Sequence, residues 1–521
     1  MADQIKSEAS PSVAAPAVEL IGIDKRFGAV HANRAVSLRI AVGSIHGIIG
    51  ENGAGKSTLM SILYGYYQAD AGEIRIAGKP VHIGNSHDAL AHGIGMVHQH
   101  FMLVDPFTVL ENVMLGVEGG YLLAAGAAQA RAELQRLQRD YKLEVDLDTP
   151  VGELPVGLQQ RVEILKALYR GAQVLILDEP TGVLTPQEAD HLFRILRALR
   201  DEGKTVILIT HKLREILEVT DRVTVMRQGA VVAERATRDT TKEELAELMV
   251  GRKVLLRVEK SPAKPGPVVL EVRGLTVIDG AGVRRVKDVS FDVRAGEIVG
   301  IAGVSGNGQS ELLEALSGIR RASSGTVKIK GSECGVTHTI DPRAMRALGL
   351  AHVPEDRQRM GLVTAFAINE SAILGYHDDK RYNGPLLMDR DKIIDLCGRQ
   401  MGDYDVRPPD PRLRTAALSG GNQQKVVLAR EFDRDPELLL VGQPTRGVDI
   451  GAIEFIHRRL IAMRDAGKAV LLVSVELDEI LSLADRILVM FDGRVVGEVA
   501  PAQATEQKLG LMMAGASEAA A

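Results

Sequence analysis

The chain contains a long internal duplication, and this repeat constrains its fold more than any other feature. GSIHGIIGENGAGKST (43–58) has a counterpart in GEIVGIAGVSGNGQSE (296–311), and VLILDEPTGVLT (174–185) has one in LLLVGQPTRGVD (438–449). The second copies begin 253 and 264 residues after the first, respectively. Because order and spacing are kept over such a distance, the sequence predicts two copies of one domain.

The length supports this division, since 521 residues exceed what one hydrophobic core usually organises. The boundary is expected in RVEKSPAKPGPV (257–268), where lysines and prolines interrupt helix and strand patterns. The predicted parts are a disordered tail (1–17), a first domain (18–256), a linker (257–267), a second domain (268–514) and a short tail (515–521).

Each half alternates short apolar runs with amphipathic segments, which predicts an α/β fold. The runs SIHGII (44–49), VLIL (174–177) and VILI (206–209) are rich in Val, Ile and Leu, as in strands buried on both faces. Leu59, Ile62, Leu63 and Tyr66 then fall at helical spacing. Residues 110–145 suggest a helical subdomain; within it YLLAAGAAQA (121–130) is a loop and helix start or a membrane contact.

A glycine-rich loop lies between the first predicted strand and this helix and fits G-x-x-x-x-G-K-[ST]. Its glycines let backbone N–H groups turn inward around phosphates, a lysine supplies a cation, and a serine hydroxyl can reach a magnesium ion. The alternative is a purely structural glycine turn. The candidate residues are Gly50, Glu51, Asn52, Gly53, Ala54, Gly55, Lys56, Ser57 and Thr58.

Two acids follow the apolar run VLIL and supply the other half of a nucleotide-cleaving site. Downstream of a phosphate loop, Asp178 is expected near magnesium and Glu179 where it can polarise a water molecule. Taken alone, acids at a strand end can be simple solvated residues. His211 ends the next predicted strand and could contact a terminal phosphate, although a lone histidine is more often a plain polar residue.

Composition argues against several other classes of protein. A net charge of −5 gives no support for a nucleic-acid binder. The two cysteines, Cys334 and Cys397, lack metal-ligand spacing, which favours a reducing compartment without a zinc site. No uninterrupted apolar run of about 18 residues is present, so the chain is not expected to span a membrane by itself. The sequence therefore predicts a cytosolic chain unless another protein docks it elsewhere.

Together these motifs resemble the ATP-binding-cassette family over nearly the whole chain. The resemblance implies two tandem P-loop NTPase domains, each with a mostly parallel sheet core, an antiparallel β portion and a helical subdomain. It implies ATP and Mg²⁺ as ligands, with Phe27 stacking on adenine, Ser57, Gln99 and Asp178 around the metal, and His211 as switch histidine. LSGGNQQ (418–424) resembles the family signature; its candidate contacts are Ser419, Gly420, Gly421 and Asn422.

The second half departs from the family pattern at its phosphate loop and its acidic pair. Glutamine replaces the loop lysine, glycine and glutamine replace the two acids, Val475 replaces the histidine, and Glu355 replaces the glutamine before the helical part. The first half is weak only in its signature, LPVGLQQ (154–160). The degenerate second site comprises Gly303, Gly306, Gly308, Gln309, Ser310, Gly442 and Gln443.

The family design pairs each half's phosphate loop with the other half's signature. Under that pairing every defect falls in one site, which predicts a single hydrolytic site per chain with Glu179 and His211 as its catalytic residues. The design also implies that ATP binding closes the halves and hydrolysis reopens them. Phe101, Met102, Leu103 and Phe107 are then either a contact with membrane subunits or part of the core.

Further strings resemble ATPases of nucleoside and simple-sugar importers, including VPEDRQRMGL (353–362) and QPTRGVD (443–449). GNGQSEL (306–312) and HQHFMLVDPFTVLENVMLG (98–116) resemble the nucleoside type more than the sugar type, which tends to carry arginine at the loop-lysine position. The implied partners are two transmembrane permease subunits and an extracytoplasmic solute-binding protein, at the cytoplasmic face of the membrane and with no nucleic acid. A soluble twin-cassette ATPase acting on ribosomes is the alternative from another class.

Overall fold

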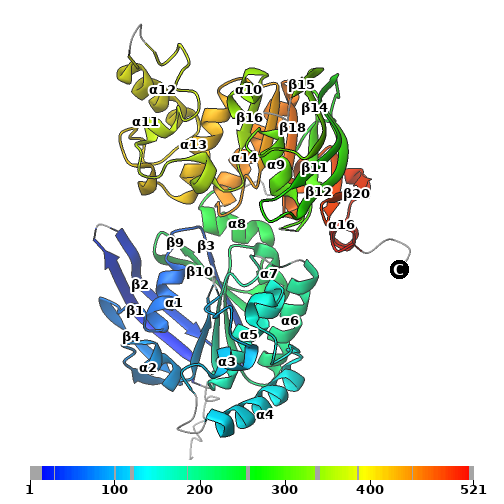
Figure 1. Ribbon diagram of the computed structural model, residues 1–521. Coiled ribbons are helices and arrows are strands. Elements are labelled where there is room, and N and C mark those ends of the chain that lie inside the picture. Colours follow the sequence, from blue (N-terminus) through cyan, green and yellow to red (C-terminus); the bar gives the residue numbers. More distant parts are fainter. Residues whose placement is uncertain are drawn as a thin grey trace, which may run out of the picture. The chain divides into compact units, whose positions relative to one another are not determined.

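The computed structural model describes residues 15–28, 30–98, 101–117, 123–182, 184, 186–253, 258–304, 306–334, 341–383, 387–448 and 450–515. They fall into two compact units, Met1–Lys253 and Val254–Ala521 (Figure 1). Each unit combines an antiparallel sheet, a mostly parallel sheet and helices. The α/β prediction with two repeated domains is therefore confirmed.

Two sheets form the β portion of the first unit. In the larger one, five neighbouring strands pair in parallel and the edge strand at one side is antiparallel. The antiparallel sheet has the order β2 (Val30–Ile40), β1 (Val18–Phe27), β4 (Ala71–Ile76), β5 (Lys79–Val81). The larger sheet has the order β10 (Ala230–Ala236), β9 (Arg222–Arg227), β3 (Ile45–Gly50), β8 (Thr205–Ile209), β7 (Val174–Asp178), β6 (Ile94–Val97).

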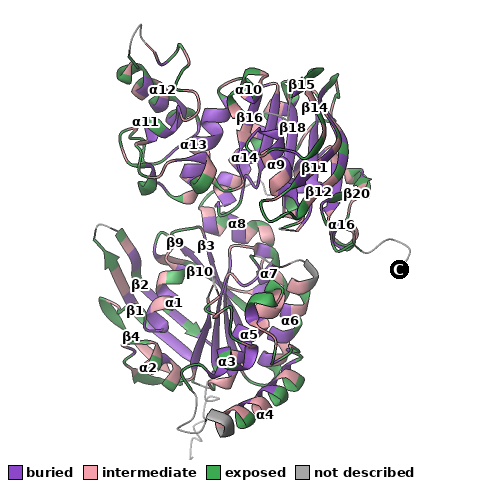
Figure 2. Ribbon diagram, viewed as in Figure 1, coloured by how far each residue is buried: buried purple, intermediate pink, exposed green. Residues whose placement is uncertain are grey.

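The apolar runs predicted as strands become β3, β7 and β8, and they are almost fully buried in Figure 2. Behind the glycine-rich loop, α1 (Lys56–Leu63) packs Leu59, Ile62 and Leu63 into one core with residues of both sheets. Tyr66 was expected on the same helical face, and this is wrong: α1 ends before it and half of its side chain is exposed.

Some of the remaining helices of the first unit pack against the larger sheet, and others pack on those helices. The helical segment predicted over 110–145 is confirmed by the helices α3 and α4; the structure describes α4 from Leu123 onward, so part of 121–130 lies outside the described residues. These helices are α2 (Ser86–Ala91), α3 (Val109–Met114), α4 (Leu123–Tyr141), α5 (Val156–Tyr169), α6 (Pro186–Asp201), α7 (Leu213–Val219) and α8 (Lys242–Val250).

The second unit repeats this topology strand for strand. Its antiparallel sheet has the order β12 (Arg284–Arg294), β11 (Val268–Ile278), β14 (Ser324–Ile329), β15 (Ser332–Cys334). Its larger sheet has the order β16 (Leu350–Val353), β17 (Leu438–Gly442), β18 (Ala469–Ser474), β13 (Ile298–Ala302), β19 (Arg486–Phe491), β20 (Arg494–Val499). Only β19 and β20 pair antiparallel in this sheet.

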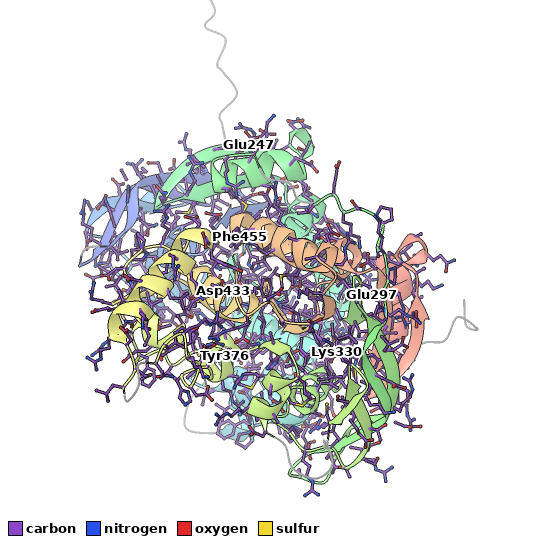
Figure 3. All side chains as sticks on the ribbon, turned by 90° about the horizontal axis from the view of Figure 1, so that it is seen from above. Glu247, Glu297, Lys330, Tyr376, Asp433 and Phe455 are labelled. Carbon is purple, nitrogen blue, oxygen red and sulfur yellow. The ribbon has the colours of Figure 1, made fainter. Side chains whose placement is uncertain are left out.

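The second unit separates into a β side and a helical side. In Figure 3, Glu297 and Lys330 lie on the β side, and Tyr376, Asp433 and Phe455 lie on the helical side. Among the described residues of both units, no helix is long and apolar enough to cross a membrane. The helices are α9 (Gln309–Leu316), α10 (Pro342–Ala347), α11 (Ile368–Ser371), α12 (Arg390–Asp403), α13 (Gly420–Phe432), α14 (Ile450–Asp465), α15 (Leu477–Leu483) and α16 (Glu506–Met513).

Candidate functional site

The first phosphate loop connects the end of β3 to the start of α1 and folds back over its own lysine. Lys56 Nζ donates to the carbonyl oxygens of Gly50 at 2.8 Å and Glu51 at 3.1 Å. Burial lowers the pKa of Lys56, and the carboxylates of Glu179 and Asp178 counteract part of this shift. A buried cation inside a closed loop is thus held near two consecutive acids at the end of β7.

Glycine is required where this loop meets the adjacent backbone. A Cβ on Gly55, whose φ is +95°, would lie 2.2 Å from the carbonyl oxygen of Ala32. The carbonyl oxygen of Gly55 also accepts a hydrogen bond from Asn33 Nδ2 at 3.0 Å. Asn33 is fully buried on β2, and nothing in the loop motif points to it, so sequence reasoning missed this support of the loop.

Asp178 and Ser57 meet at the carboxyl end of the parallel sheet. Asp178 is the last residue of β7, is 8% exposed, and its carboxylate hydrogen-bonds Ser57 at the start of α1. Burial and the neighbouring Glu179 raise the pKa of Asp178, although Ser57 and Lys56 oppose this. The pair offers a carboxylate and a hydroxyl oxygen, the ligand types that Mg²⁺ prefers.

Glu179 is turned toward His211 by an unusual backbone conformation. Its φ is +48°, in the left-handed region, and its N–H donates to the Ile209 carbonyl at 2.8 Å. The Oε1 atom lies 2.9 Å from His211 Nδ1. Burial raises the pKa of Glu179. The hydrogen bond with His211 and the charges of His211 and Lys56 lower this pKa by more than burial raises it, so the net shift is downward. Glu179 is thereby kept ionised and oriented.

The other predicted residues of the first unit lie in different surroundings. Phe27, at the end of β1, is 41% exposed and packs edge-on against Tyr67 with ring centroids 5.1 Å apart. Gln99 lies outside the described residues. In the apolar stretch after it, Met102 is 59% exposed and Phe107 is 38% exposed. Phe101 and Leu103 are partly exposed, so the stretch as a whole is not buried in the core.

The second loop keeps the backbone of the first and loses its cation. Gly308, with φ +93°, precedes α9 as Gly55 precedes α1, and a Cβ there would lie 2.1 Å from the Arg285 carbonyl oxygen. Gln309 occupies the lysine position and is 4% exposed. Within the described part of the chain, its Nε2 has no hydrogen-bond partner.

The strand end after β17 keeps the shape of the first unit without its chemistry. Gln443 has φ +46°, nearly equal to that of Glu179, and its N–H donates to the Val473 carbonyl at 2.8 Å. Its Oε1 accepts from the backbone N–H of Val475 at 3.3 Å, where the first unit has a histidine side chain. A neutral amide cannot accept a proton usefully at neutral pH, so a general base is missing here.

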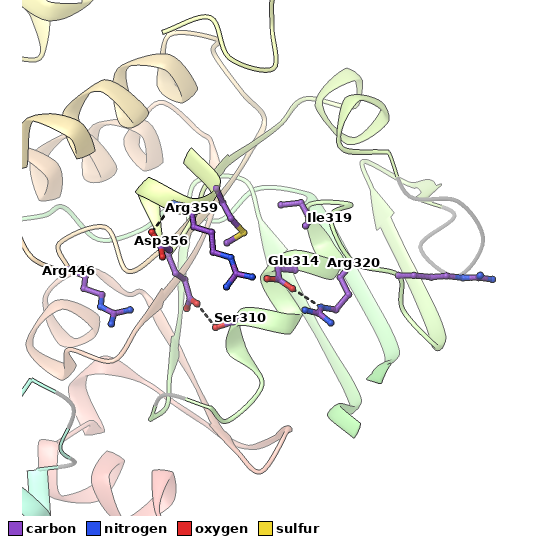
Figure 4. Close-up of a pocket in the computed structure, with 10 residues that line it drawn as sticks. Ser310, Glu314, Ile319, Arg320, Asp356, Arg359 and Arg446 are labelled. Carbon is purple, nitrogen blue, oxygen red and sulfur yellow. Dashed lines mark hydrogen bonds and ion pairs between the residues drawn. The ribbon is translucent and has the colours of Figure 1, made fainter. Parts of the chain in front are cut away.

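One pairing in the second unit was not anticipated from the sequence. Ser310 Oγ donates a hydrogen bond to the carboxylate of Glu355 (Figure 4), which also hydrogen-bonds Gln443. Burial raises the pKa of Glu355 despite these bonds and the nearby charge of Arg446. In the sequence, Glu355 differs from the family pattern only by replacing a glutamine. The space beside Gly442 that its side chain enters is visible only in the three-dimensional structure.

The two signature segments differ at their helix N-termini. Ser419 caps α13 and its Oγ accepts from the backbone N–H of Asn422 at 3.4 Å and from Asn422 Nδ2 at 2.9 Å. Gly420 and Gly421 follow in the first turn, so N–H groups are presented as an anion site requires. In the first unit, Pro155 precedes α5 and makes no capping hydrogen bond with its side chain.

Comparison with known proteins agrees with this geometry. The family model described as ABC transporter matches residues 33–182 and 286–446, once in each unit. The guanosine import ATP-binding protein NupO of Bacillus subtilis is 49% identical over 96% of this chain and 98% of its own length. The nucleoside import ATP-binding protein NupA of Lactococcus lactis is 48% identical, with the same two coverages. The glucose import ATP-binding protein TsgD13 of Haloferax volcanii is 44% identical over 97% of each chain.

The chain therefore belongs to the ABC transporter family. Within this class it is an ATP-binding protein with two cassettes that acts as the ATP-hydrolysing subunit of an importer.

Proposed function

We propose that the chain drives the uptake of nucleosides by hydrolysing ATP at one composite site. The cluster of Lys56, Ser57, Asp178, Glu179 and His211 in the first unit carries this proposal. The equivalent positions of the second unit hold no carboxylate and no histidine, so none of them can accept a proton from water. The asymmetry supports one hydrolytic site per chain.

The oxygen donors of the first unit fit a magnesium ion. Ser57 and Asp178 are already joined by a hydrogen bond at the mouth of the loop, and Gln99 is the further ligand that the family resemblance implies. One carboxylate with a hydroxyl and phosphate oxygens is a usual set for Mg²⁺. When bound, the ion would neutralise charge on the phosphate oxygens.

In this proposal, protein groups position the nucleotide and the attacking water. The loop N–H groups and Lys56 hold the phosphates, and Phe27 stacks on the adenine base. Glu179 orients a water molecule and accepts its proton as the water oxygen bonds to the γ-phosphorus and the bond to the ADP oxygen breaks. His211 holds the Glu179 carboxylate in place for this step.

The site is completed by the signature of the second unit. Ser419, Gly420, Gly421 and Asn422 offer a capped helix N-terminus, which suits a γ-phosphate. The start of α5 lacks such a cap, so the intact signature is assigned to the intact loop. The crossed pairing, implied by the family design, remains part of the proposal.

A matched pair of substitutions tests the assignment of the general base. Glu179→Gln should lower kcat for ATP hydrolysis by about 10²–10⁴-fold, the usual contribution of such a group. The reverse exchange at the equivalent position, Gln443→Glu, should leave kcat nearly unchanged, because Gly442 and Gln309 remain. Both would be measured as phosphate release by full-length chain with its membrane partners. Equal losses from the two variants would contradict a single hydrolytic site.

The partners proposed are two transmembrane permease subunits and an extracytoplasmic solute-binding protein. Met102 and Phe107 support a contact with the permeases, because both are large apolar side chains exposed on one short segment. The chain would then lie on the cytoplasmic face of the membrane. Fractionation tests this: the chain should sediment with membranes only when the permeases are co-expressed, whereas a ribosome-acting ATPase would not depend on them.

Nucleosides are preferred over sugars as the solute because the second loop contains GNGQSEL (306–312) and two of the relatives are described as guanosine and nucleoside importers. A sugar is the second candidate, since another relative is described as a glucose importer. Uptake of labelled nucleosides and pentoses would be compared in cells lacking and regaining the chain. Restored uptake of nucleosides alone is expected; restored uptake of pentoses alone would overturn the assignment.

A further inference from the structure

Glu215 on α7 is a buried acid that the proposed mechanism does not use. The residue is 5% exposed, and Thr181, which is 3% exposed, donates the hydrogen of its hydroxyl group to Glu215 Oε1. Thr181 lies two residues after Glu179, in the turn that follows β7. Glu215 therefore holds the chain immediately after the proposed general base.

Glu215 also interacts with the strand end that carries His211. Burial raises the pKa of Glu215, and the hydroxyl groups of Thr181 and Thr210 are among the groups that oppose this rise. Thr210 follows the last residue of β8 and directly precedes His211. One carboxylate thus spans the ends of β7 and β8, the same two strand ends that are joined by the 2.9 Å contact between Glu179 and His211.

The equivalent glutamate of the second unit makes a different contact. Glu479 lies 264 residues further along the chain, and its Oε1 is 3.2 Å from Nε2 of His457 on α14. The first unit has Phe193 at the position of this histidine, and its side chain cannot form such a hydrogen bond. Among the described residues, no hydrogen bond joins Glu479 to Thr445, the counterpart of Thr181. The bond to the turn is therefore made in the unit that has the complete acid pair.

This hydrogen bond is not needed to form the turn itself, and it does not serve stability alone. Gln443 has nearly the same left-handed φ as Glu179, +46° against +48°, without such a bond. Glu215 Oε2 is buried and has no hydrogen-bond partner among the described residues. An apolar side chain would avoid this loss of solvation. What the glutamate adds is a fixed distance between the two strand ends.

We propose that Glu215 is a positioning residue for ATP hydrolysis. It acts through the hydroxyl groups of Thr181 and Thr210. By fixing the two strand ends, it keeps the Glu179 carboxylate within hydrogen-bond distance of His211. A displacement of about 1 Å at a reacting group can cost about 10²-fold in rate, so control of this distance affects turnover directly. This role rests on the proposed functions of Glu179 and His211.

The test removes the hydroxyl group of Thr181 and keeps the shape of its side chain. In the full-length chain with its membrane partners, Thr181→Val should lower kcat for ATP hydrolysis about 10–100-fold. KM for ATP should stay nearly unchanged, because the phosphate loop is untouched. Thr181→Ser keeps the O–H group and should retain most of the activity. Thr445→Val, the same change at the equivalent position of the second unit, is the control and should hydrolyse ATP as the parent does.

A double variant separates positioning from folding. Thr181→Val leaves the buried Glu215 carboxylate without its donor, so the unfolding midpoint should fall. Adding Glu215→Met replaces both partners by apolar groups and should restore much of the lost stability. The value of kcat should nevertheless stay low, because the bond between the turn and α7 is still absent.

The pH profile of the double variant gives a readout that a loss of stability alone would not move. The charged and titratable groups that face Glu179 are Lys56, Asp178, His211 and Lys212. Burial raises the pKa of Glu179, and His211 and Lys212, which follow β8, both lower it. Loosening this strand end should therefore raise the pKa of Glu179 and move the acidic limb of kcat to higher pH.

Glu179→Gln is assayed alongside, so that the two roles are tested separately. If it loses turnover while Thr181→Val and the double variant keep the parent's kcat and acidic limb, the positioning role of Glu215 is overturned and the general base stands. A loss in Thr445→Val as large as that in Thr181→Val also overturns the positioning role. Turnover retained by Glu179→Gln overturns the base assignment and the positioning role with it.

Discussion

At the scale of single residues, the hydrogen bond between His211 and Glu179 controls the charge of the proposed base. Burial alone raises the pKa of Glu179, and His211 is the main group that reverses this shift. His211→Ala should therefore raise the pKa of Glu179. Since Glu179 must be ionised to accept a proton, the acidic limb of the kcat profile should move to higher pH.

This shift would be measured as kcat for ATP hydrolysis against pH under saturating ATP. His87→Ala, a change of an exposed histidine on α2, serves as the control and should leave the limb in place. An unchanged acidic limb in His211→Ala would show that the hydrogen bond does not set the charge of Glu179.

Residues whose role follows from local spacing could be predicted from the sequence. Lys56 and Asp178 belong to this group, because the glycine-rich loop before α1 and the end of β7 fix their positions through local sequence alone. Asn33 and Glu355 could not be predicted. Asn33 acts on a loop more than twenty residues away in sequence, and Glu355 enters a space that exists only because residue 442 lacks a side chain.

At the scale of elements, the turn between β3 and α1 depends on a single close approach. Gly55 and Gly171 both have positive φ, but only Gly55 faces another backbone, while a Cβ on Gly171 would meet nothing within 4 Å. Gly171→Ala should cost about 1–2 kcal/mol of folding free energy from its left-handed backbone. Gly55→Ala should cost roughly 1–3 kcal/mol more, because its Cβ would also overlap the carbonyl oxygen of Ala32.

Urea unfolding of the full-length chain would measure this difference, and ATP binding by the first loop should fall only in Gly55→Ala. If both variants lose the same stability and bind ATP equally, the contact with the Ala32 carbonyl does not shape the loop.

Elements with uniform apolar runs were located well from the sequence, as β3, β7 and β8 show. Periodicity was less informative at helix ends. Tyr66 fits the helical spacing of α1, yet Gly65 with φ +84° follows the last helical turn and redirects the chain. The left-handed backbone at Glu179 and Gln443 carries no sequence signal, because neither residue type favours that region.

At the scale of the whole molecule, the crossed pairing that the family design implies predicts that each unit contributes a different part of one site. Ser419→Ala should reduce kcat for ATP hydrolysis about tenfold or more, since a preorganised donor to the γ-phosphate is lost. Pro155→Ala, at the equivalent position of the first unit, should have little effect. Both would be assayed with the intact chain and its membrane partners. A loss from Pro155→Ala as large as that from Ser419→Ala would contradict the crossed pairing.

The glycine at 442 and the glutamate at 355 also restrict how this sequence can change over time. Aspartate at 442 overlaps the glutamate side chain, and loss of the glutamate first leaves the serine at 310 without an acidic neighbour. Either single step toward the arrangement of the first unit therefore disturbs contacts that the other residue makes. The two positions are coupled, so a change at one of them limits which side chain the other can carry.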